Sequence, residues 1–262
     1  MHSMKESDKF SDSSVLEGMT SISAVLHAAD SDFNDRTVKE IWIDEGRLDK
    51  KSRELSYLRH QSERLGFPIR PVTAKQLDEV TVGNTHGGIV AFCSDRTIPS
   101  LSELENSLPS NGFYAFLEGI EDPYNFGYSL RSLYAAGLDG VILPPRNWMS
   151  AAGVVARSSA GTSEMLRMYV AEPASIPAFF KQHGYRVACA GIRDSVSLYE
   201  ADLAKPLLLV IGGEKRGISR TVLEQADLTV RIDYQSDFHG SLSAAAATAV
   251  LAFEVVRQNQ KS

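Results

Sequence analysis

Residues 207–219 read LLLVIGGEKRGIS, an unbroken apolar run that ends in a glycine-rich polar turn. A short apolar run bounded by turn residues is typical of a strand buried on both faces, as in a parallel sheet. Helical stretches at 126–136, 151–159 and 176–183 alternate with similar runs. The other β-rich runs are 113–117, 140–143, 167–171, 186–190 and 228–232. Residues 113–262 are therefore predicted to form an α/β domain with a parallel sheet.

Ligands of parallel α/β sheets bind beyond the carboxyl ends of the strands, so the loops after these strands are candidate sites. Three segments carry polar motifs: 117–131 (LEGIEDPYNFGYSLR), 210–219 (VIGGEKRGIS) and 232–245 (IDYQSDFHGSLSAA). In the first, Asn125 is a candidate helix cap, and Arg131 suits a phosphate, a ribose or a structural ion pair. The motif alone does not separate a ligand site from a capped helix.

The other two motifs also leave alternatives open. The glycine turn is not a phosphate loop, because Ile218 and Ser219 follow Gly217 where Lys and Ser or Thr are required. It suits a small polar ligand or a plain turn. In the third motif, Ser241 is a candidate N-cap for a helix over 241–259. His239 is interpreted as an exposed loop residue rather than a catalytic base.

The first half of the chain predicts a smaller α/β domain over residues 15–95. Helices are expected at 22–29, 51–65 and 74–80, and strands at 40–43, 68–72 and 88–93. Residues 96–112 contain two prolines and several Ser, Asn and Gly, which indicates a linker. Residues 1–14 are polar and are expected to form a disordered leader.

Composition excludes several classes of protein. In 262 residues, 43% are hydrophobic and 23% charged, which is ordinary for a globular protein and not for a disordered chain. No apolar run approaches the roughly 20 residues of a membrane span, and the N-terminus lacks the apolar centre of a signal peptide. Cys93 and Cys189 are too far apart in sequence for a disulfide framework or a CxxC metal site, so we expect a reducing, cytoplasmic location.

The net charge of −6 argues against a general nucleic-acid coat protein, but the charge is uneven. Residues 47–75 contain eight basic and three acidic side chains. This stretch predicts a surface for RNA phosphates, with Arg47, Lys50, Lys51 and Arg59 as candidate contacts, or simply a solvated helix face.

In their order and spacing, the motifs resemble the SpoU/TrmH family of RNA ribose 2′-O-methyltransferases, in the SPOUT superfamily. The first motif is similar to the family's acidic-Pro-x-Asn-x-Gly-x-x-x-Arg signature. The matching residues are Asp122, Pro123, Asn125, Gly127 and Arg131, then Arg157 and 159–161, then Gly212, Glu214 and 217–218, then Ser241 and Leu242. Residues 86–91 (HGGIVA) resemble the substrate-binding domain that precedes the catalytic domain in many members.

The resemblance implies a SPOUT-type sheet with a deep trefoil knot, a homodimer, and S-adenosylmethionine as methyl donor without a metal. The acceptor would be a ribose 2′-hydroxyl in rRNA or tRNA. The implied catalytic residues are Asn125, Arg131, Glu214 and Ser241. The positions whose backbone would hold the donor are Gly212, Ile232 and Leu242.

Two departures from the family pattern keep other functions open. Asp233 and Tyr234 stand where members carry Pro-Met, and Ser243 replaces an Asn. These changes favour, as an alternative, a catalytically weak RNA-binding paralogue. A nucleotide-binding enzyme of ordinary doubly wound fold is a third hypothesis, although the chain has neither phosphate-binding fingerprint.

Overall fold

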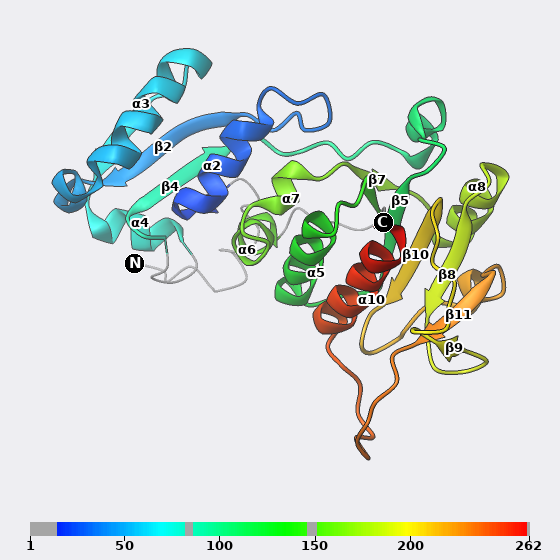
Figure 1. The fold of residues 1–262 in the computed structure, drawn as a ribbon. Helices are drawn as coiled ribbons and strands as arrows, with labels where there is room; N and C mark the ends of the chain where they lie inside the picture. The colour runs from blue at the N-terminus through cyan, green and yellow to red at the C-terminus, as the bar shows by residue number, and fades with distance from the viewer. Residues whose placement is uncertain (1–14, 82–85, 146–150, 261–262) are drawn as a thin grey trace. The chain divides into compact units, whose positions relative to one another are not determined.

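A computed structural model describes residues 15–81, 86–145 and 151–260 of the chain (Figure 1). The predicted leader at 1–14 lies outside these residues. The chain forms two compact units, one of Met1–Thr97 with Asn147–Met165 and the other of Ile98–Arg146 with Leu166–Ser262. We call them unit 1 and unit 2.

Unit 1 contains a four-stranded sheet in the order β1-β4-β2-β3, in which β2 and β3 are parallel and the other pairs antiparallel. Its strands are β1 (Val15–Glu17), β2 (Val38–Asp44), β3 (Ile69–Val72) and β4 (Ile89–Cys93). Its first helices are α2 (Gly18–Ala28), α3 (Ser52–Leu65) and α4 (Ala74–Val80), with short 3-10 turns η1 (Glu45–Arg47) and η2 (Asp49–Lys51) before α3. Leu16, Ile22, Ile41 and Leu58 are fully buried in its core.

Two short helices from the middle of the chain also belong to unit 1, a difference from the boundaries expected from sequence. They are α6 (Ala152–Ser158) and α7 (Thr162–Met165). The buried Glu164 carboxylate accepts hydrogen bonds from Arg36 Nε and Asn34 Nδ2, each at 3.0 Å. A buried carboxylate needs such partners, and these come from the segment before β2. This long-range pairing holds α7 in unit 1.

Unit 2 contains a seven-stranded, wholly parallel sheet in the order β7-β6-β5-β10-β8-β11-β9. The parallel sheet predicted from sequence is confirmed. The strands are β5 (Phe113–Glu118), β6 (Gly140–Leu143), β7 (Met168–Val170), β8 (Arg186–Ala190), β9 (Val196–Ser197), β10 (Leu207–Gly212) and β11 (Leu228–Arg231). Every residue of β5 is buried, as is every residue of β10 except Gly212.

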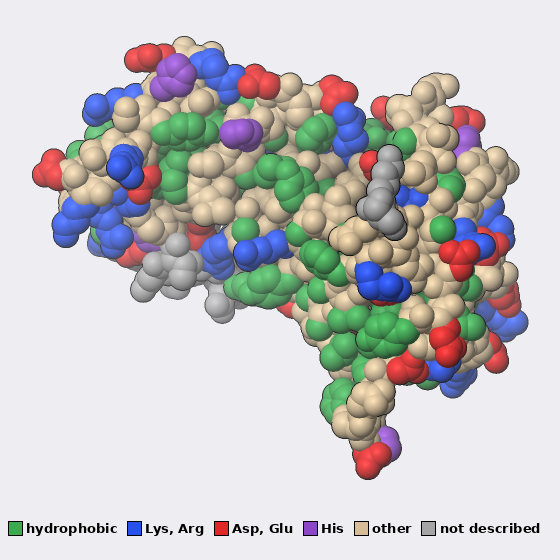
Figure 2. All heavy atoms as spheres, viewed as in Figure 1, with side chains coloured by type: hydrophobic (Ala, Val, Ile, Leu, Met, Phe, Trp, Pro, Cys, Tyr) green, Lys and Arg blue, Asp and Glu red, His purple; other side chains and the backbone are tan. Residues whose placement is uncertain are grey.

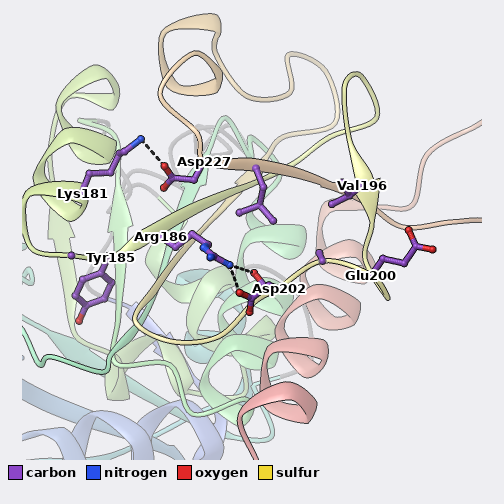
Figure 3. A pocket seen from close by; sticks show the side chains of 10 residues that line it. Lys181, Tyr185, Arg186, Val196, Glu200, Asp202 and Asp227 are labelled. Atoms are coloured by element: carbon purple, nitrogen blue, oxygen red, sulfur yellow. Dashed lines mark hydrogen bonds and ion pairs between the residues drawn. The ribbon is translucent and has the colours of Figure 1, made fainter.

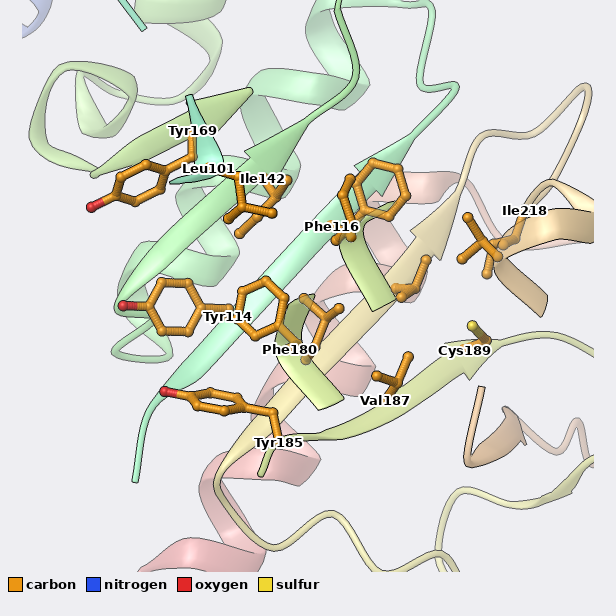
Figure 4. Close-up of a cluster of buried hydrophobic side chains, with 14 of the residues drawn as sticks. Leu101, Tyr114, Phe116, Ile142, Tyr169, Phe180, Tyr185, Val187, Cys189 and Ile218 are labelled. Atoms are coloured by element: carbon orange, nitrogen blue, oxygen red, sulfur yellow. The ribbon is translucent and has the colours of Figure 1, made fainter. Parts of the chain in front are cut away.

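Helices pack on this sheet. On one side α5 (Pro123–Ala135) lies beside α10 (Ala244–Asn259), and Thr248 Oγ1 is 3.2 Å from Ser129 Oγ (Figure 1). A second hydrophobic cluster joins strand residues such as Phe116 and Val187 to Phe180 (Figure 4). This cluster includes residues of η3 (Leu101–Ser107) and α8 (Ile176–Gln182). The remaining elements of unit 2 are the 3-10 turn η5 (Pro173–Ser175) and the short helix α9 (Arg220–Leu223).

The two helices that begin beside the predicted site start at other residues than expected. Asp122, not Asn125, caps α5: its Oδ2 accepts from Asn125 N at 2.9 Å, and Pro123 takes the first helical position that proline favours. Ser243, not Ser241, caps α10, its Oγ accepting from Ala246 N at 3.2 Å. The trefoil knot implied by the resemblance stays a prediction.

Candidate active site

A cavity of about 670 Å³ lies at the carboxyl ends of β8, β10 and β11. Five of the predicted site residues line it: Gly212, Glu214, Ile232, Ser241 and Leu242. Its volume is in the usual range for small-molecule sites, roughly 300–1,000 Å³. The cavity is therefore at the edge of the sheet where the fold predicts a ligand.

The lining divides into an apolar and a polar part. Ile211, Ile218, Val230, Ala244 and Leu251 are buried and line the cavity. The segment after β11 adds exposed polar residues to the lining, His239 and Ser241, together with the exposed Phe238 ring. His239 is exposed, as predicted. Such a cavity suits a ligand with a flat apolar ring and a polar or charged remainder.

The glycines of the second motif are required by the backbone itself. A Cβ on Gly213 would lie 1.8 Å from Gly119 O, and one on Gly212 would lie 2.4 Å from Gly217 C. No side chain fits at these distances. Gly213 N donates to Glu118 O at 2.7 Å, so the turns after β5 and β10 touch through their backbones. The glycines thus bring two of the three motifs together.

Glu214 joins all three motifs. Its Oε1 accepts from Asn125 Nδ2 at 3.0 Å and from Ala244 N at 3.1 Å. Ala244 N is one of the amides at the start of α10 that have no partner within the helix, and this position favours a negative charge. The carboxylate therefore fixes the Asn125 side chain and the start of α10 against the glycine turn.

Glu118 has a supporting role that the sequence analysis missed. It ends β5, is 9% exposed, and its Oε2 accepts from Ser219 N at 3.0 Å. A buried carboxylate paired with a backbone amide holds the far end of the glycine turn in place. The signal in the sequence is an acidic residue at the end of an otherwise apolar strand.

Arg131 is not brought into this network. It lies on the exposed side of α5 and forms no hydrogen bond or ion pair within 15–81, 86–145 and 151–260. It shares a helical stripe with Tyr124 and Tyr128, at i, i+4 and i+7, both more than 40% exposed. Arg131 therefore forms no hydrogen bond with Asn125 and no ion pair with Glu214, which are paired with each other.

The segment after β11 is tied to its surroundings by side chains. Arg231 Nε donates to Asp233 Oδ1 at 2.7 Å, and Leu242 N donates to Tyr234 Oη at 3.0 Å. Hydrogen bonds from Ser197 and Arg231 lower the pKa of Asp233. The Tyr234 and Phe238 ring centroids are 5.7 Å apart. We call residues 233–242 the cavity loop.

Other features of the described residues offer weaker sites. A second cavity is lined by charged side chains that pair with one another, Lys181 with Asp227 at 2.7 Å and Arg186 with Asp202 at 2.6 Å (Figure 3). Within the described ranges, no cluster of His, Cys, Asp and Glu could hold a metal, and no helix is long and apolar enough to span a bilayer. Burial raises the pKa of the Cys189 thiol to about 12, which makes it unreactive.

The basic residues predicted from sequence lie in unit 1, Arg47, Lys50 and Lys51 on the turns before α3 and Arg59 in the middle of that helix. Lys50 and Arg59 are exposed, whereas Arg47 pairs with Asp44 at 3.2 Å and Lys51 with Glu54 at 3.3 Å. Lys and Arg side chains gather on this end of unit 1 in Figure 2. The start of a helix adds a partial positive charge. We call Arg47, Lys50, Lys51 and Arg59 the basic cluster.

Comparison with known proteins gives two family matches. Residues 112–253 match the SpoU rRNA Methylase family, and residues 15–99 match the model described as RNA 2'-O ribose methyltransferase substrate binding. A 23S rRNA (guanosine-2'-O-)-methyltransferase RlmB of Shewanella oneidensis is 32% identical over 84% of this chain and 89% of its own. The protein of that name from Bordetella pertussis is 29% identical over 94% of this chain and 98% of its own.

Solved structures share the fold. An AdoMet-bound rRNA methyltransferase from Sinorhizobium meliloti aligns with a TM-score of 0.78 and 20% identity, over all of this chain and 98% of that one. The SpoU methyltransferase AviRb from Streptomyces viridochromogenes, in complex with AdoMet, aligns with a TM-score of 0.77 and 19% identity, over 98% of each chain. At these identities the likeness is one of fold.

Proposed function

Because the chain belongs to the SpoU rRNA methylase family, we propose that it transfers a methyl group from S-adenosylmethionine to a ribose 2′-hydroxyl of rRNA. The observation that carries this proposal is the convergence of three motifs on Glu214 beside one cavity. The names of the relatives support a guanosine of 23S rRNA as the target.

The cavity suits S-adenosylmethionine on its own chemistry. Apolar side chains such as Ile211, Ile218 and Leu251 would take the adenine ring, and the backbone at Gly212, Ile232 and Leu242 would bind its polar edge and the ribose. Glu214, at the polar side, carries a charge opposite to that of the sulfonium. The residues present therefore fit the donor and can bind it directly, without a bridging metal.

When bound, the donor supplies an activated methyl group, so the protein has to place the ribose hydroxyl and favour loss of its proton. An arginine guanidinium in a protein is too weak an acid to serve as a general base. We therefore assign Arg131 to the phosphate next to the target and to stabilising the developing alkoxide. Asn125, held by Glu214, and the exposed Ser241 would orient the target nucleotide.

A homodimer would complete this site. Tyr124 and Tyr128 on α5 and Val250 and Phe253 on α10 are exposed, and Figure 2 shows hydrophobic side chains on the surface over these helices. Arg131 belongs to the same stripe of α5 as the two tyrosines. A second copy packed on this face would bury these apolar side chains and bring Arg131 into the interface.

RNA capture is assigned to unit 1, through the basic cluster on α3 and the turns before it. Lys50 and Arg59 are exposed and would pair with phosphates, which contributes affinity without reading sequence. We place the protein in the cytoplasm, since its substrate would be rRNA and its two thiols are reduced.

The test is methyl transfer to defined RNAs. The purified chain with tritiated S-adenosylmethionine should label unmethylated 23S rRNA at one guanosine, and a 2′-deoxy substitution at that nucleotide should abolish labelling. Binding of both donor and RNA without labelling of 23S rRNA, 16S rRNA or tRNA would instead identify the RNA-binding paralogue. Absence of donor binding in calorimetry would refute both.

A further inference from the structure

The cavity loop differs chemically from the Pro-Met pattern of the family, because Asp233 and Tyr234 occupy those two positions. A proline would lock one backbone angle at the start of this loop. In this chain, side-chain contacts hold the start of the loop instead of a proline. Asp233 is bound by Arg231 at 2.7 Å, and Arg231 also donates to Ser195 O at 2.6 Å.

Tyr234 closes the loop. Its hydroxyl oxygen accepts from Leu242 N at 3.0 Å and so joins residues eight apart in sequence. The centroid of the Phe238 ring is 5.7 Å from that of the Tyr234 ring, and the Phe238 ring is so close to Gly240 that a Cβ on Gly240 would lie 2.5 Å from it. Tyr234, Phe238 and Gly240 all line the cavity. The loop is thus folded around one hydrogen bond and one ring contact.

These two contacts matter because the loop is otherwise in solvent. Every residue from 234 to 241 is exposed, so the loop buries no core of its own. Ordering such a segment costs conformational entropy. If the loop were disordered before binding, that cost would be subtracted from the affinity of any ligand that contacts it.

We propose that Tyr234 is a positioning residue for the methyl donor, which holds Leu242 and the cavity loop in the binding conformation before the donor arrives. The proposal rests on the proposed function and adds a residue that the family pattern does not contain. Tyr234 acts through the loop backbone and takes no part in methyl transfer itself. Its effect is therefore expected in donor affinity and not in the turnover of the saturated enzyme.

The test removes only the hydroxyl, in Tyr234→Phe of the full chain. Because one hydrogen bond makes a modest net contribution, the Kd for S-adenosylmethionine in calorimetry should rise about two- to twelvefold. Amide hydrogen exchange of residues 233–243 should be faster in the variant before donor is added and equal to wild type at saturation. Turnover at saturating donor should be unchanged.

Tyr199→Phe is the matched control, because Tyr199 is 64% exposed and lies outside the cavity. It should change neither Kd nor exchange. An unchanged or lower Kd in Tyr234→Phe would overturn the proposal, as would faster exchange throughout unit 2. Failure of the wild-type chain to bind donor would refute the proposed function. The exchange comparison without donor would still test whether the hydrogen bond between Tyr234 and Leu242 orders the cavity loop.

Discussion

At the scale of single residues, the site depends on which side chains have partners and which do not. Glu214 accepts hydrogen bonds from the Asn125 side chain and from the backbone of Ala244, and these bonds connect the three motifs. Arg131 has no such partner among the described residues, and its guanidinium is free to meet a substrate. We therefore expect the two charged residues of the predicted site to differ in role, with Glu214 holding the motifs together and Arg131 acting on the substrate.

This division predicts the effect of Arg131→Ala. Loss of a cation that stabilises developing negative charge typically slows the chemical step about 100- to 1,000-fold. Arg131 does not line the cavity, so the Kd for S-adenosylmethionine should change less than about twofold. Single-turnover methyl transfer and calorimetry on the same preparation measure the two effects. Unchanged turnover would exclude Arg131 from the mechanism.

Site residues could be predicted from the sequence where a motif fixes them, but their hydrogen-bond partners could not. The cavity contains five of the seven residues assigned to catalysis or donor binding. The sequence could not indicate that Asn125 bonds to Glu214, because that contact spans 89 positions and depends on the order of the strands. Glu118 was missed for the same reason: its partner, Ser219, lies 101 positions away.

At the scale of elements, strand positions followed from apolar runs, and the starts of α4 and α8 were also predicted, whereas the starts of α5 and α10 were not. Residues 122–125 and 241–243 each offer two residues that can cap a helix. Tertiary contacts decide between them: Asn125 is engaged by Glu214, and Glu214 also binds Ala244 N, which fixes α10 to begin after Ser243. The short strands β1 and β9 carry too few residues for a periodicity to show.

The cap of α10 yields a second prediction. Ser243→Ala should lower the free energy of unfolding by about 1 kcal/mol, the usual contribution of an N-cap. Ser243→Asn, which restores the family residue, should keep the stability, because Asn caps as well as Ser does. Chemical denaturation of the three proteins checks this. Equal stability of wild type and Ser243→Ala would contradict the capping role.

The same pair of variants tests the departure from the family. If Ser243 lowers activity relative to the family's Asn, Ser243→Asn should raise the rate of methyl transfer at unchanged stability. If the rate does not change, another group performs the function of that Asn. The capping bond thus allows the structural and the catalytic consequences of one position to be separated.

At the scale of the whole molecule, the net charge of −6 conceals how charge is distributed. Part of the basic excess over residues 47–75 is neutralised in the structure, since Arg64 pairs with Asp30 and Arg70 with Glu40. The exposed cations of this stretch that form no ion pair within the described residues lie on η2, α3 and α4. Local sequence counts predicted the charged surface, but only three-dimensional pairing shows which cations are available.

This distribution predicts the salt dependence of RNA binding. Lys50→Ala combined with Arg59→Ala should weaken RNA binding and reduce the slope of log K against log salt by about one per lost phosphate contact. The Kd for S-adenosylmethionine should stay the same. Lys181→Ala is the control, because Lys181 is exposed but paired with Asp227 in unit 2. An equal salt slope for the double variant and wild type would place RNA elsewhere.

The last prediction concerns the exposed apolar face of α5 and α10. Exposed apolar side chains that gather on one face, as Tyr128, Val250 and Phe253 do on α5 and α10 (Figure 2), indicate contact with another protein surface. Wild type should therefore sediment at twice 28.7 kDa, and Phe253→Asp should sediment as a monomer. Since Arg131 forms no hydrogen bond or ion pair with a cavity residue of its own chain within the described ranges, the monomer should also lose methyl transfer while retaining donor binding. Tyr199→Asp, at an exposed site elsewhere in unit 2, should remain dimeric and active. A monomeric wild type with full activity would show that Arg131 reaches the substrate without a second copy.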